Sequence, residues 1–199
     1  MVESKPFIIA ITGASGSLYG IRMIQELIKH NRTVYTLITD SAKQVIPFET
    51  GKSWEQWYSE FNQNNEYVQD IPLNNIYHKI ASGSYSTEAM IISPCSMGTL
   101  GRIASGISSN LLERAADVTL KEKRSLILMA RETPLNRIHI QNMLTINEAG
   151  GIIFPPTPAF YAKPQTIEEL VQATVCRVLQ LAGLEINNPY SWQPDEREW

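Results

Sequence analysis

The sequence predicts an α/β fold: one domain of three layers, with a parallel β-sheet between two layers of helices. Short apolar runs typical of buried strands alternate with helical segments about five times along the chain. Apolar residues make up 43% of the 199 positions, which is enough for a full core. The length also favours one domain over two. Ligands bind at the carboxyl ends of the strands in such folds, so the segments that follow the strands are where a site is expected.

The N-terminal part of the chain is predicted to form two strands and two helices. An apolar run at Phe7–Thr12 ends at glycines and is typical of a buried strand. Apolar residues at helical spacing then predict a helix over Leu18–His30. A second strand, rich in β-branched residues, is expected at Thr33–Thr39. A helix follows at Ser41–Thr50, and Pro47 is expected to kink or break it.

Residues 51–80 differ in character from the rest of the chain. They contain tryptophans and tyrosines together with many asparagines and glutamines, and they show no clear period. We expect this segment to leave the sheet and to contain one short helix.

The second half of the chain continues the alternation. Strands are expected at Ala89–Ser93, Ser125–Ala130 and Gly151–Phe154, and helices at Ser108–Arg124, Leu135–Ala149 and Thr166–Ala182. Residues 94–96 are expected to form a turn. From Asn187 onward the chain contains two prolines and a charged end. We therefore divide it into a domain at residues 1–186 and a tail at 187–199 that extends from the domain or reaches a neighbouring chain.

Charge and hydropathy exclude several classes of protein. The net charge of −3 argues against bulk binding to nucleic acid or to a membrane surface. The apolar run at residues 7–11 is too short for a signal peptide, and no stretch is long enough to cross a membrane. These features predict a cytoplasmic protein. Charged residues make up only 19% of the chain, against about 25% in typical domains. This deficit suggests that part of the surface is covered by partners.

No metal site is expected. Cys95 and Cys176 are far apart in the sequence, and the three histidines share no ligand spacing. The four aspartates are also scattered, so the chain has no acidic cluster of the kind that holds magnesium on a diphosphate.

The loop after the first predicted strand is the first candidate site. Gly13, Gly16 and Gly20 would let the backbone pass close to a ligand, and the N–H groups at the start of the following helix would attract a phosphate. A tight turn with no ligand is the alternative. Familiar phosphate and nucleophile motifs are absent: there is no GxGxxG, no true P-loop, no Tyr-xxx-Lys pair and no GxSxG.

Two further strand ends carry candidate residues. Small and hydroxyl side chains at residues 94–99 are suited to donate to a phosphate or a ring carbonyl. Cys95 in this segment is either a nucleophile or, more commonly for such a residue, a buried thiol. Arg131 and Glu132 follow the strand at Ser125–Ala130, where a cation is suited to an anionic ligand.

A second set of cations lies outside the strand ends. Arg114 and Lys121 are seven residues apart and so share one helix face, and Arg177 lies off the apolar stripe of the last helix. Tyr161 follows a proline-rich loop. Each of the three charged side chains, taken alone, is equally consistent with a solvated surface.

Together these segments resemble the UbiX family of flavin prenyltransferases, which includes small subunits associated with phenolic acid decarboxylases. The matching motifs are TGASG (12–16), SPCSMGTL (93–100), NLLERAADVTLKE (110–122), RETPL (131–135), IHIQNM (138–143) and PPTPAFY (155–161). They occur in the order of the family, and the resemblance covers roughly residues 6–184.

The resemblance implies a flavodoxin-like, Rossmann-related fold and a specific activity. Members transfer a dimethylallyl group from dimethylallyl phosphate to reduced FMN, and the prenylated FMN serves a UbiD-type decarboxylase in ubiquinone biosynthesis or in aromatic acid decarboxylation. The family usually forms a homododecamer with its sites at subunit contacts. The absence of an aspartate cluster fits a reaction that needs no metal and uses a monophosphate donor.

The resemblance also assigns residues to roles. FMN would contact Gly13, Ala14, Ser15, Thr39, Ser96, Met97, Gly98, Thr99 and Arg131. The prenyl phosphate would be held by Arg114, Lys121, Tyr161 and Arg177. Proton movements would be served by Ser15, Glu49 and Glu132. The base that accepts the flavin proton is either Glu49 or the released phosphate itself.

Two other functions remain open at this point. A related group of flavoproteins resembles this one in fold, oxidatively decarboxylates peptides that end in cysteine and uses a histidine near the end of the first βα unit. His30 is the one candidate here, but it lies at the far end of that helix. A non-enzymatic alternative is an FMN-binding carrier or regulatory subunit of a decarboxylase. Storage of FMN would not require the second anion site formed by Arg114, Lys121, Tyr161 and Arg177.

Overall fold

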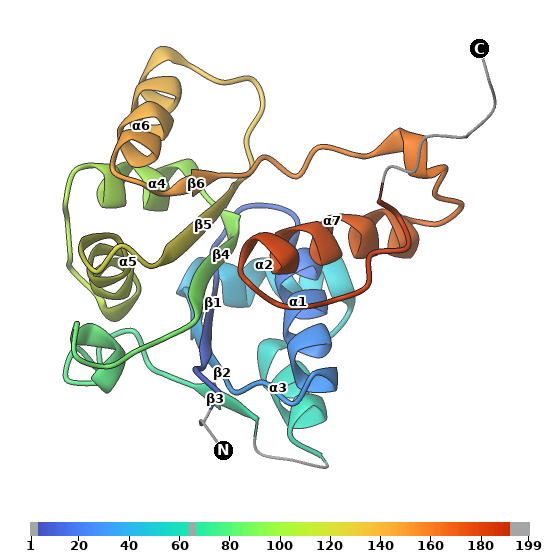
Figure 1. The fold of residues 1–199 in the computed structure, drawn as a ribbon, viewed down its shortest axis with the longest axis horizontal. Helices are drawn as coiled ribbons and strands as arrows, with labels where there is room; N and C mark the ends of the chain where they lie inside the picture. Colours follow the sequence, from blue (N-terminus) through green and yellow to red (C-terminus); the bar gives the residue numbers. More distant parts are fainter. Residues whose placement is uncertain (1–3, 64–66, 192–199) are drawn as a thin grey trace.

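The computed structural model describes residues 4–63 and 67–191, and within them the strands form one parallel sheet (Figure 1). The order across the sheet is β3-β2-β1-β4-β5-β6, and every neighbouring pair is parallel. The strands are β1 (Phe7–Ile11), β2 (Val34–Ile38), β3 (Val68–Asp70), β4 (Ala89–Cys95), β5 (Ser125–Ala130) and β6 (Ile152–Ile153). The α/β class predicted from the alternation is confirmed.

Helices cover both faces of the sheet. They are α1 (Ser17–Lys29), α2 (Asp40–Thr50), α3 (Trp54–Phe61), α4 (Met97–Ala104), α5 (Leu111–Lys121), α6 (Arg137–Glu148) and α7 (Ile167–Leu181), with short 3-10 turns at Lys79–Ala81 and Phe160–Ala162. Helices α1, α2, α3 and α7 pack on one face, and α4, α5 and α6 lie on the other (Figure 1). No helix of the described residues is long and apolar enough to cross a membrane.

Strand β1 lies at the centre of both cores. Its side chains alternate between the faces, so Phe7, Ile9 and Ile11 join the core under α1 and α7. Ile8 and Ala10 join the core under α4 and α5. All five are essentially inaccessible to solvent, which explains the continuous apolar run in the sequence.

The order of the strands places a crevice between β1 and β4. The chain moves from β1 outward to β2 and β3, then returns to the other side of β1 as β4. The connections that leave β1 and β4 therefore go to opposite faces, and their carboxyl ends diverge. Open parallel sheets bind their ligands at such a point.

Three elements differ from the sequence prediction. Strand β3 and helix α4 were not expected. Strand β4 extends to Cys95, into the segment at residues 94–96 that was predicted to be a turn. Helix α4 begins where the side chain of Ser96 accepts a hydrogen bond from the Thr99 amide, and α5 begins at a cap formed by Asn110. The predicted helix over Ser108–Arg124 is correspondingly shorter.

The expected break at Pro47 is wrong. Helix α2 continues through this residue to Thr50. Pro47 removes one N–H donor from the helix, and the turn that follows it is closed by other hydrogen bonds. The side chain of Thr50 donates to the Ile46 carbonyl at 2.8 Å, and Gly51 donates to the Pro47 carbonyl at 3.0 Å. These bonds close the last turn.

The segment after α7 returns toward its own domain. The Gln180 side chain donates to the carbonyl of Ile186 at 3.1 Å, and Asn188, Tyr190 and Ser191 line a cavity against α7. The part of the expected tail at residues 187–191 thus packs on its own chain, and residues 192–199 lie outside the described residues.

Gly20 has a packing role that we did not predict. A Cβ atom at this position would lie 2.4 Å from the carbonyl oxygen of Ser93 and 2.9 Å from the Ile11 side chain. Glycine at this position therefore permits close contact between α1 and the sheet, and the idea that Gly20 gives a ligand access to the backbone is wrong.

We expect Gly20→Ala to destabilise the fold by about 1–3 kcal/mol, because a methyl group at this contact forces α1 away from β4. Urea denaturation measures the change. Gln25→Ala on the same helix is the control and is expected to stay within about 0.5 kcal/mol of the parent protein. Equal stability of Gly20→Ala and the parent would contradict the packing role.

Candidate active site

The hydroxyl group of Thr12 bridges β1 and β4 at the crevice between them. The Thr12 Oγ1 atom donates to the Pro94 carbonyl at 2.7 Å and accepts from the Ser96 amide at 2.8 Å. Thr12 is 1% exposed, so these bonds are shielded from water. They join the end of β1 to the end of β4 and to the residue that follows β4, since Pro94 and Ser96 are 82 and 84 positions from Thr12 along the chain. Thr12 was not predicted as a site residue.

The loop after β4 begins α4 and contains four of the predicted FMN contacts. The Ser96 Oγ atom accepts from the Thr99 amide at 3.3 Å and donates to Thr99 Oγ1 at 3.1 Å. Met97 and Thr99 are buried, whereas Gly98 is exposed. The exposed backbone at Gly98 leaves this turn accessible to a flat ligand.

The loop after β1 lies against the start of α2. A Cβ atom at Gly13 would be 2.6 Å from both the Cβ and the Oγ of Ser41, so the close approach requires glycine. Thr39 caps α2 by accepting from the Ala42 amide at 3.1 Å, and its hydroxyl lies 3.1 Å from the Ser41 hydroxyl. Gly13 and Thr39, two predicted FMN contacts, are thereby brought together with Ser41.

Glu49 occupies the N-terminus of α1. One carboxylate oxygen accepts from the Ser17 amide at 2.8 Å and the Ser17 hydroxyl at 2.6 Å, and both oxygens lie within 3.1 Å of the Gly16 amide nitrogen. The Ser15 side chain also hydrogen-bonds this carboxylate. The structure therefore brings together two of the three residues predicted to move protons. The expectation that these helix amides are free for a phosphate is wrong, because Glu49 fills them.

Glu49 is held in its ionised form. Partial burial acts to raise its pKa, but hydrogen bonds from Ser15, Ser17 and the amides of Gly16 and Ser17 outweigh it, so the pKa lies below the ordinary value of a glutamate. The group is therefore a carboxylate at neutral pH, and the hydrogen bonds that lower its pKa also make it a weaker base than a free glutamate.

Arg131 and Glu132 follow β5 at the same edge of the sheet. The Arg131 amide donates to the Cys95 carbonyl at 3.2 Å, which ties this loop to the loop after β4. Both side chains are exposed. A Glu132 carboxylate oxygen accepts from the Thr133 amide at 3.0 Å, so Glu132 is turned toward its own loop, and no hydrogen bond among the described residues joins it to Glu49.

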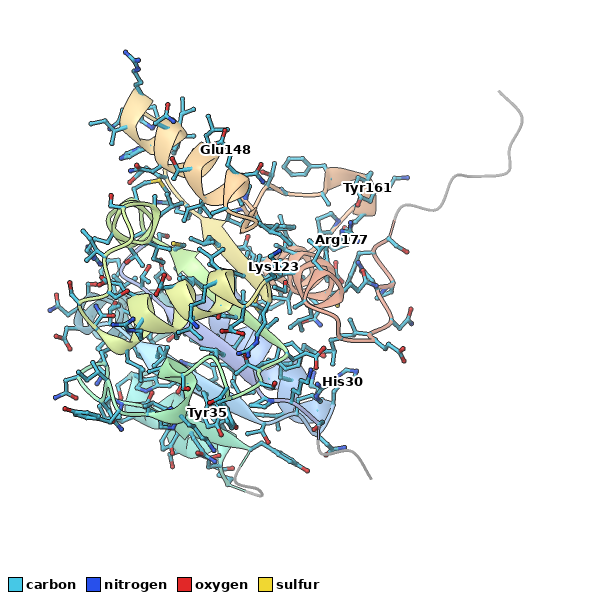
Figure 2. The ribbon with its side chains drawn as sticks, turned by 60° about the vertical axis from the view of Figure 1, so that its left-hand side comes forward. His30, Tyr35, Lys123, Glu148, Tyr161 and Arg177 are labelled. Carbon is cyan, nitrogen blue, oxygen red and sulfur yellow. The ribbon has the colours of Figure 1, made fainter. Side chains whose placement is uncertain are left out.

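Tyr161 and Arg177 line one cavity of about 430 Å³ between the loop after β6 and helix α7. Figure 2 shows the two residues on neighbouring segments. Phe154, Thr174 and Tyr190 also line it. None of the side chains that line this cavity is a carboxylate, so the Arg177 guanidinium makes it suited to an anion. The sequence did not indicate Thr174 or Tyr190 as site residues, because Thr174 lies on the face of a helix and Tyr190 lies in a segment without a motif.

Arg114 and Lys121 lie on the other side of the sheet. Both are on α5, which packs into the core formed with Ile8 and Ala10, whereas α7 packs into the opposite core. Each side chain is about half exposed. Arg114 pairs with Asp117 at 3.7 Å, and Lys121 pairs with Glu122 at 2.7 Å. Within one chain, the four predicted phosphate ligands thus form two separate pairs.

The other candidate groups are accounted for by structure. Burial raises the pKa of the Cys95 thiol to about 12, so this residue is not a nucleophile. His30 follows the last turn of α1 and its ring bonds the Glu26 carbonyl at 2.9 Å, at the end of the helix away from the loop. Among the described residues, no group of three or more potential ligands is placed to hold a metal ion.

Several known proteins resemble this chain over most of its length. A family model described as Flavoprotein matches residues 1–179. The flavin prenyltransferase UbiX of Neisseria meningitidis is 41% identical over 189 residues, which cover 95% of this chain and 97% of that protein. The UbiX-like flavin prenyltransferase of Bacillus subtilis, a probable assignment, is 37% identical and is covered to 91%.

Solved structures show the same fold. AnUbiX, crystallised in complex with FMN and dimethylallyl pyrophosphate, superposes with a TM-score of 0.87 at 37% identity over 98% of this chain and 100% of that one. A dodecameric FMN-dependent UbiX-like decarboxylase from Escherichia coli O157:H7 gives 0.82 at 36% identity, with 98% of each chain covered. The peptidyl-cysteine decarboxylase EpiD, at 17% identity and 0.55, shares the fold alone.

The ionised state of Glu49 leads to a test of stability. We expect Glu49→Gln to lower the free energy of unfolding at pH 7 by about 1 kcal/mol, because a partly exposed charge-assisted contact to the α1 amides is lost. The pKa of Glu49 is lower in the folded state. Its contribution is therefore complete above the ordinary glutamate pKa and is lost as the pH falls through the folded pKa.

Unfolding curves of the two proteins should therefore separate at pH 7 and converge under acidic conditions, below the ordinary carboxyl range. Glu185→Gln, which changes an exposed glutamate after α7, controls for the loss of charge. A difference that stays constant down to acidic pH would contradict this account of Glu49.

Proposed function

The chain belongs to the Flavoprotein family, and we propose that it is a flavin prenyltransferase, which transfers a dimethylallyl group from a dimethylallyl phosphate ester to reduced FMN. One observation carries the proposal. The chain superposes over nearly its whole length on a protein whose crystal structure contains both FMN and dimethylallyl pyrophosphate.

The edge of the sheet supplies a site that fits FMN. The proposed contacts are Gly13, Ala14, Ser15, Thr39, Ser96, Met97, Gly98, Thr99 and Arg131. The glycine at position 13 permits close backbone approach, Gly98 exposes backbone, and Arg131 places an exposed cation at the end of β5. Because Glu49 fills the α1 amides, the flavin phosphate is assigned to Arg131 and the hydroxyls near Thr39.

The second anion site distinguishes this function from flavin storage. The reaction breaks the bond between the allylic carbon and the ester oxygen, and the phosphate leaves with the bonding electron pair. Tyr161 and Arg177 line a cavity suited to stabilise that charge. A carrier or regulatory subunit needs no such cavity. A peptidyl-cysteine decarboxylase would need a histidine at the site, whereas His30 lies at the C-terminal end of α1, away from the loop after β1.

Protons are proposed to move through Ser15 and Glu49. Reduced FMN supplies the nucleophilic ring atoms. The second bond breaks the C=C bond of the transferred dimethylallyl group: one alkene carbon bonds the ring carbon, the other takes up a proton, and the ring carbon loses its own proton. Glu49 is ionised at neutral pH and hydrogen-bonded to Ser15, so a proton can pass along this pair, and we assign the proton of the ring carbon to it. Glu132, exposed at the end of β5, is assigned to the leaving phosphate.

Two copies of the chain are proposed to complete each site. Arg114 and Lys121 lie across the sheet from Tyr161 and Arg177, so one chain cannot place all four on one phosphate. A neighbouring copy is proposed to supply the missing pair, within a homododecamer like that of the E. coli relative. Helix α6 offers a contact surface, because its Ile138, Ile140 and Leu144 are exposed.

We assign residues 1–186 to the catalytic domain, and a UbiD-type decarboxylase to the role of recipient for the prenylated FMN. The proposed setting is the cytoplasm, where the two buried free thiols, Cys95 and Cys176, would stay reduced.

A direct assay tests the function. Anaerobic incubation with reduced FMN and dimethylallyl phosphate should add one dimethylallyl unit to the flavin, as measured by mass spectrometry. We expect activity to survive EDTA, because the described residues contain no metal-ligand cluster and the cations Arg114, Lys121 and Arg177 can offset the roughly −1.5 to −2 charge of a phosphate monoester.

The diphosphate ester is the matched comparison, since AnUbiX was crystallised with it. We expect the monophosphate to give the higher kcat/KM. Loss of activity with EDTA and recovery with magnesium would overturn the metal-free account, and an unmodified flavin would overturn the function.

Mixing variants tests the division of the site between chains. Arg114→Ala and Arg177→Ala should each bind FMN and each be nearly inactive alone. Random co-assembly should restore about a quarter of the parent activity, because about one site in four then combines an intact Arg114 with an intact Arg177 from the neighbouring copy.

The matched control mixes Arg177→Ala with Tyr161→Phe. These residues line the same cavity of one chain, so every site in the mixture lacks one of them and no activity should return. Mass spectrometry of the intact assemblies verifies mixing. The absence of recovery in verified Arg114→Ala and Arg177→Ala mixtures would show that one chain supplies both residues.

A further inference from the structure

We infer that Arg102 is a positioning residue, which holds the flavin-binding turn at the start of α4 in a fixed relation to α5. The inference rests on the proposed function, because it assigns FMN to that turn. It names a residue that neither the sequence motifs nor the comparisons single out. Helix α5 also carries Arg114 and Lys121, so one side chain would link the flavin-binding turn to the helix that carries this pair.

The Arg102 guanidinium bonds two acceptors at once. Its Nε atom donates to a carboxylate oxygen of Glu113 on α5. Its Nη2 atom donates to Thr99 Oγ1 at 3.3 Å, in the first turn of its own helix. Only the planar fork of arginine presents donors in this geometry, and a lysine ammonium cannot bridge both acceptors in the same way.

Thr99 connects Arg102 to the crevice between β1 and β4 through hydrogen bonds. Its hydroxyl accepts from Ser96 Oγ at 3.1 Å, and the Ser96 amide donates to Thr12 Oγ1 at 2.8 Å. Thr12 in turn bonds the Pro94 carbonyl. A continuous series of hydrogen bonds therefore runs from the end of β1, through the start of α4, to Arg102.

Glu113 anchors the other end. Its side chain is 1% exposed, and its second carboxylate oxygen accepts from the Ser109 amide at 2.8 Å. Arg102 is its ion-pair partner in the described part of the chain. A buried carboxylate without a cation is strongly unfavourable, so Arg102 has little freedom to leave this position.

The guanidinium also lies beside the exposed backbone of the turn. A Cβ atom at Gly98 would be 3.6 Å from Arg102 Nη1. Arg102 is 45% exposed, so it stands at the rim of the proposed flavin site rather than in the core. It acts on FMN through Ser96, Gly98 and Thr99, whose placement it fixes.

The experiment separates positioning from charge compensation. Arg102→Met removes the fork but leaves Glu113 unpaired in the core, which lowers the thermal unfolding temperature. The double variant Arg102→Met/Glu113→Gln removes the buried charge as well, and the side-chain amide that it introduces keeps an acceptor for the Ser109 N–H. Lys29→Met is the matched control, because Lys29 pairs with the buried Glu26 on α1, away from the turn.

Each protein is assembled, freed of flavin and titrated with FMN, with flavin fluorescence as the readout. We expect the double variant to regain most of the unfolding temperature and still to bind FMN about tenfold more weakly. In the prenylation assay, its KM for reduced FMN should rise about tenfold, with kcat at saturating FMN within about twofold of the parent. Lys29→Met should lower the unfolding temperature and leave FMN affinity unchanged.

Parent-like FMN affinity in the double variant would overturn the inference, since Arg102 would then serve only to neutralise Glu113. If the double variant does not fold, Arg102→Lys, which keeps the charge, replaces it: a tenfold loss of FMN affinity supports positioning and an unchanged affinity overturns it. A parent protein that binds FMN but leaves it unprenylated would refute the proposed function, and the titrations would still decide the role of Arg102.

Discussion

The site depends on the hydroxyl group of Thr12, which holds together the two strands at the centre of the sheet where their connections diverge. β1 and β4 are neighbours in space, but their following loops go to opposite faces. The Thr12 amide also donates to the Pro94 carbonyl at 3.3 Å, so this residue spans the gap with its backbone as well as its side chain. Because Thr12 both donates to Pro94 and accepts from Ser96, the loops from the two faces share one geometry. The proposed flavin site is built on that shared edge.

Glu49 gives the loop after β1 a second constraint. Its carboxylate satisfies the amides at the start of α1, which in many folds of this class are left for a ligand phosphate. The loop therefore has a defined structure before any ligand arrives, and the flavin meets a preformed surface. The same hydrogen bonds keep Glu49 ionised and lower its basicity, so the structure of the loop and the protonation state of this carboxylate come from one set of contacts.

Much of the fold could be predicted from sequence, because β1, β2, β4 and β5 are buried on both faces and appear as apolar runs. β3 is only three residues long with one buried side chain, which is too short to show a period. α4 has buried apolar residues at helical spacing, Met97, Leu100 and Ile103, but it is only eight residues long, and Gly98 and Gly101 lower its helix propensity. The topology predicted which loops meet. It could not reveal that Glu49 reaches α1 across 33 positions, or that the four phosphate ligands fall on two faces, since these depend on packing between distant segments.

The division of the phosphate ligands has an electrostatic consequence. In a single chain Arg114 faces Asp117 and Lys121 faces Glu122, so much of the positive charge of this pair is neutralised locally. Tyr161 and Arg177 in their cavity contribute only one full positive charge. A phosphate dianion binds tightly only where several cations converge in a site of reduced water access. Neither pair meets that condition alone, so a site shared between chains makes donor binding, and therefore catalysis, depend on assembly.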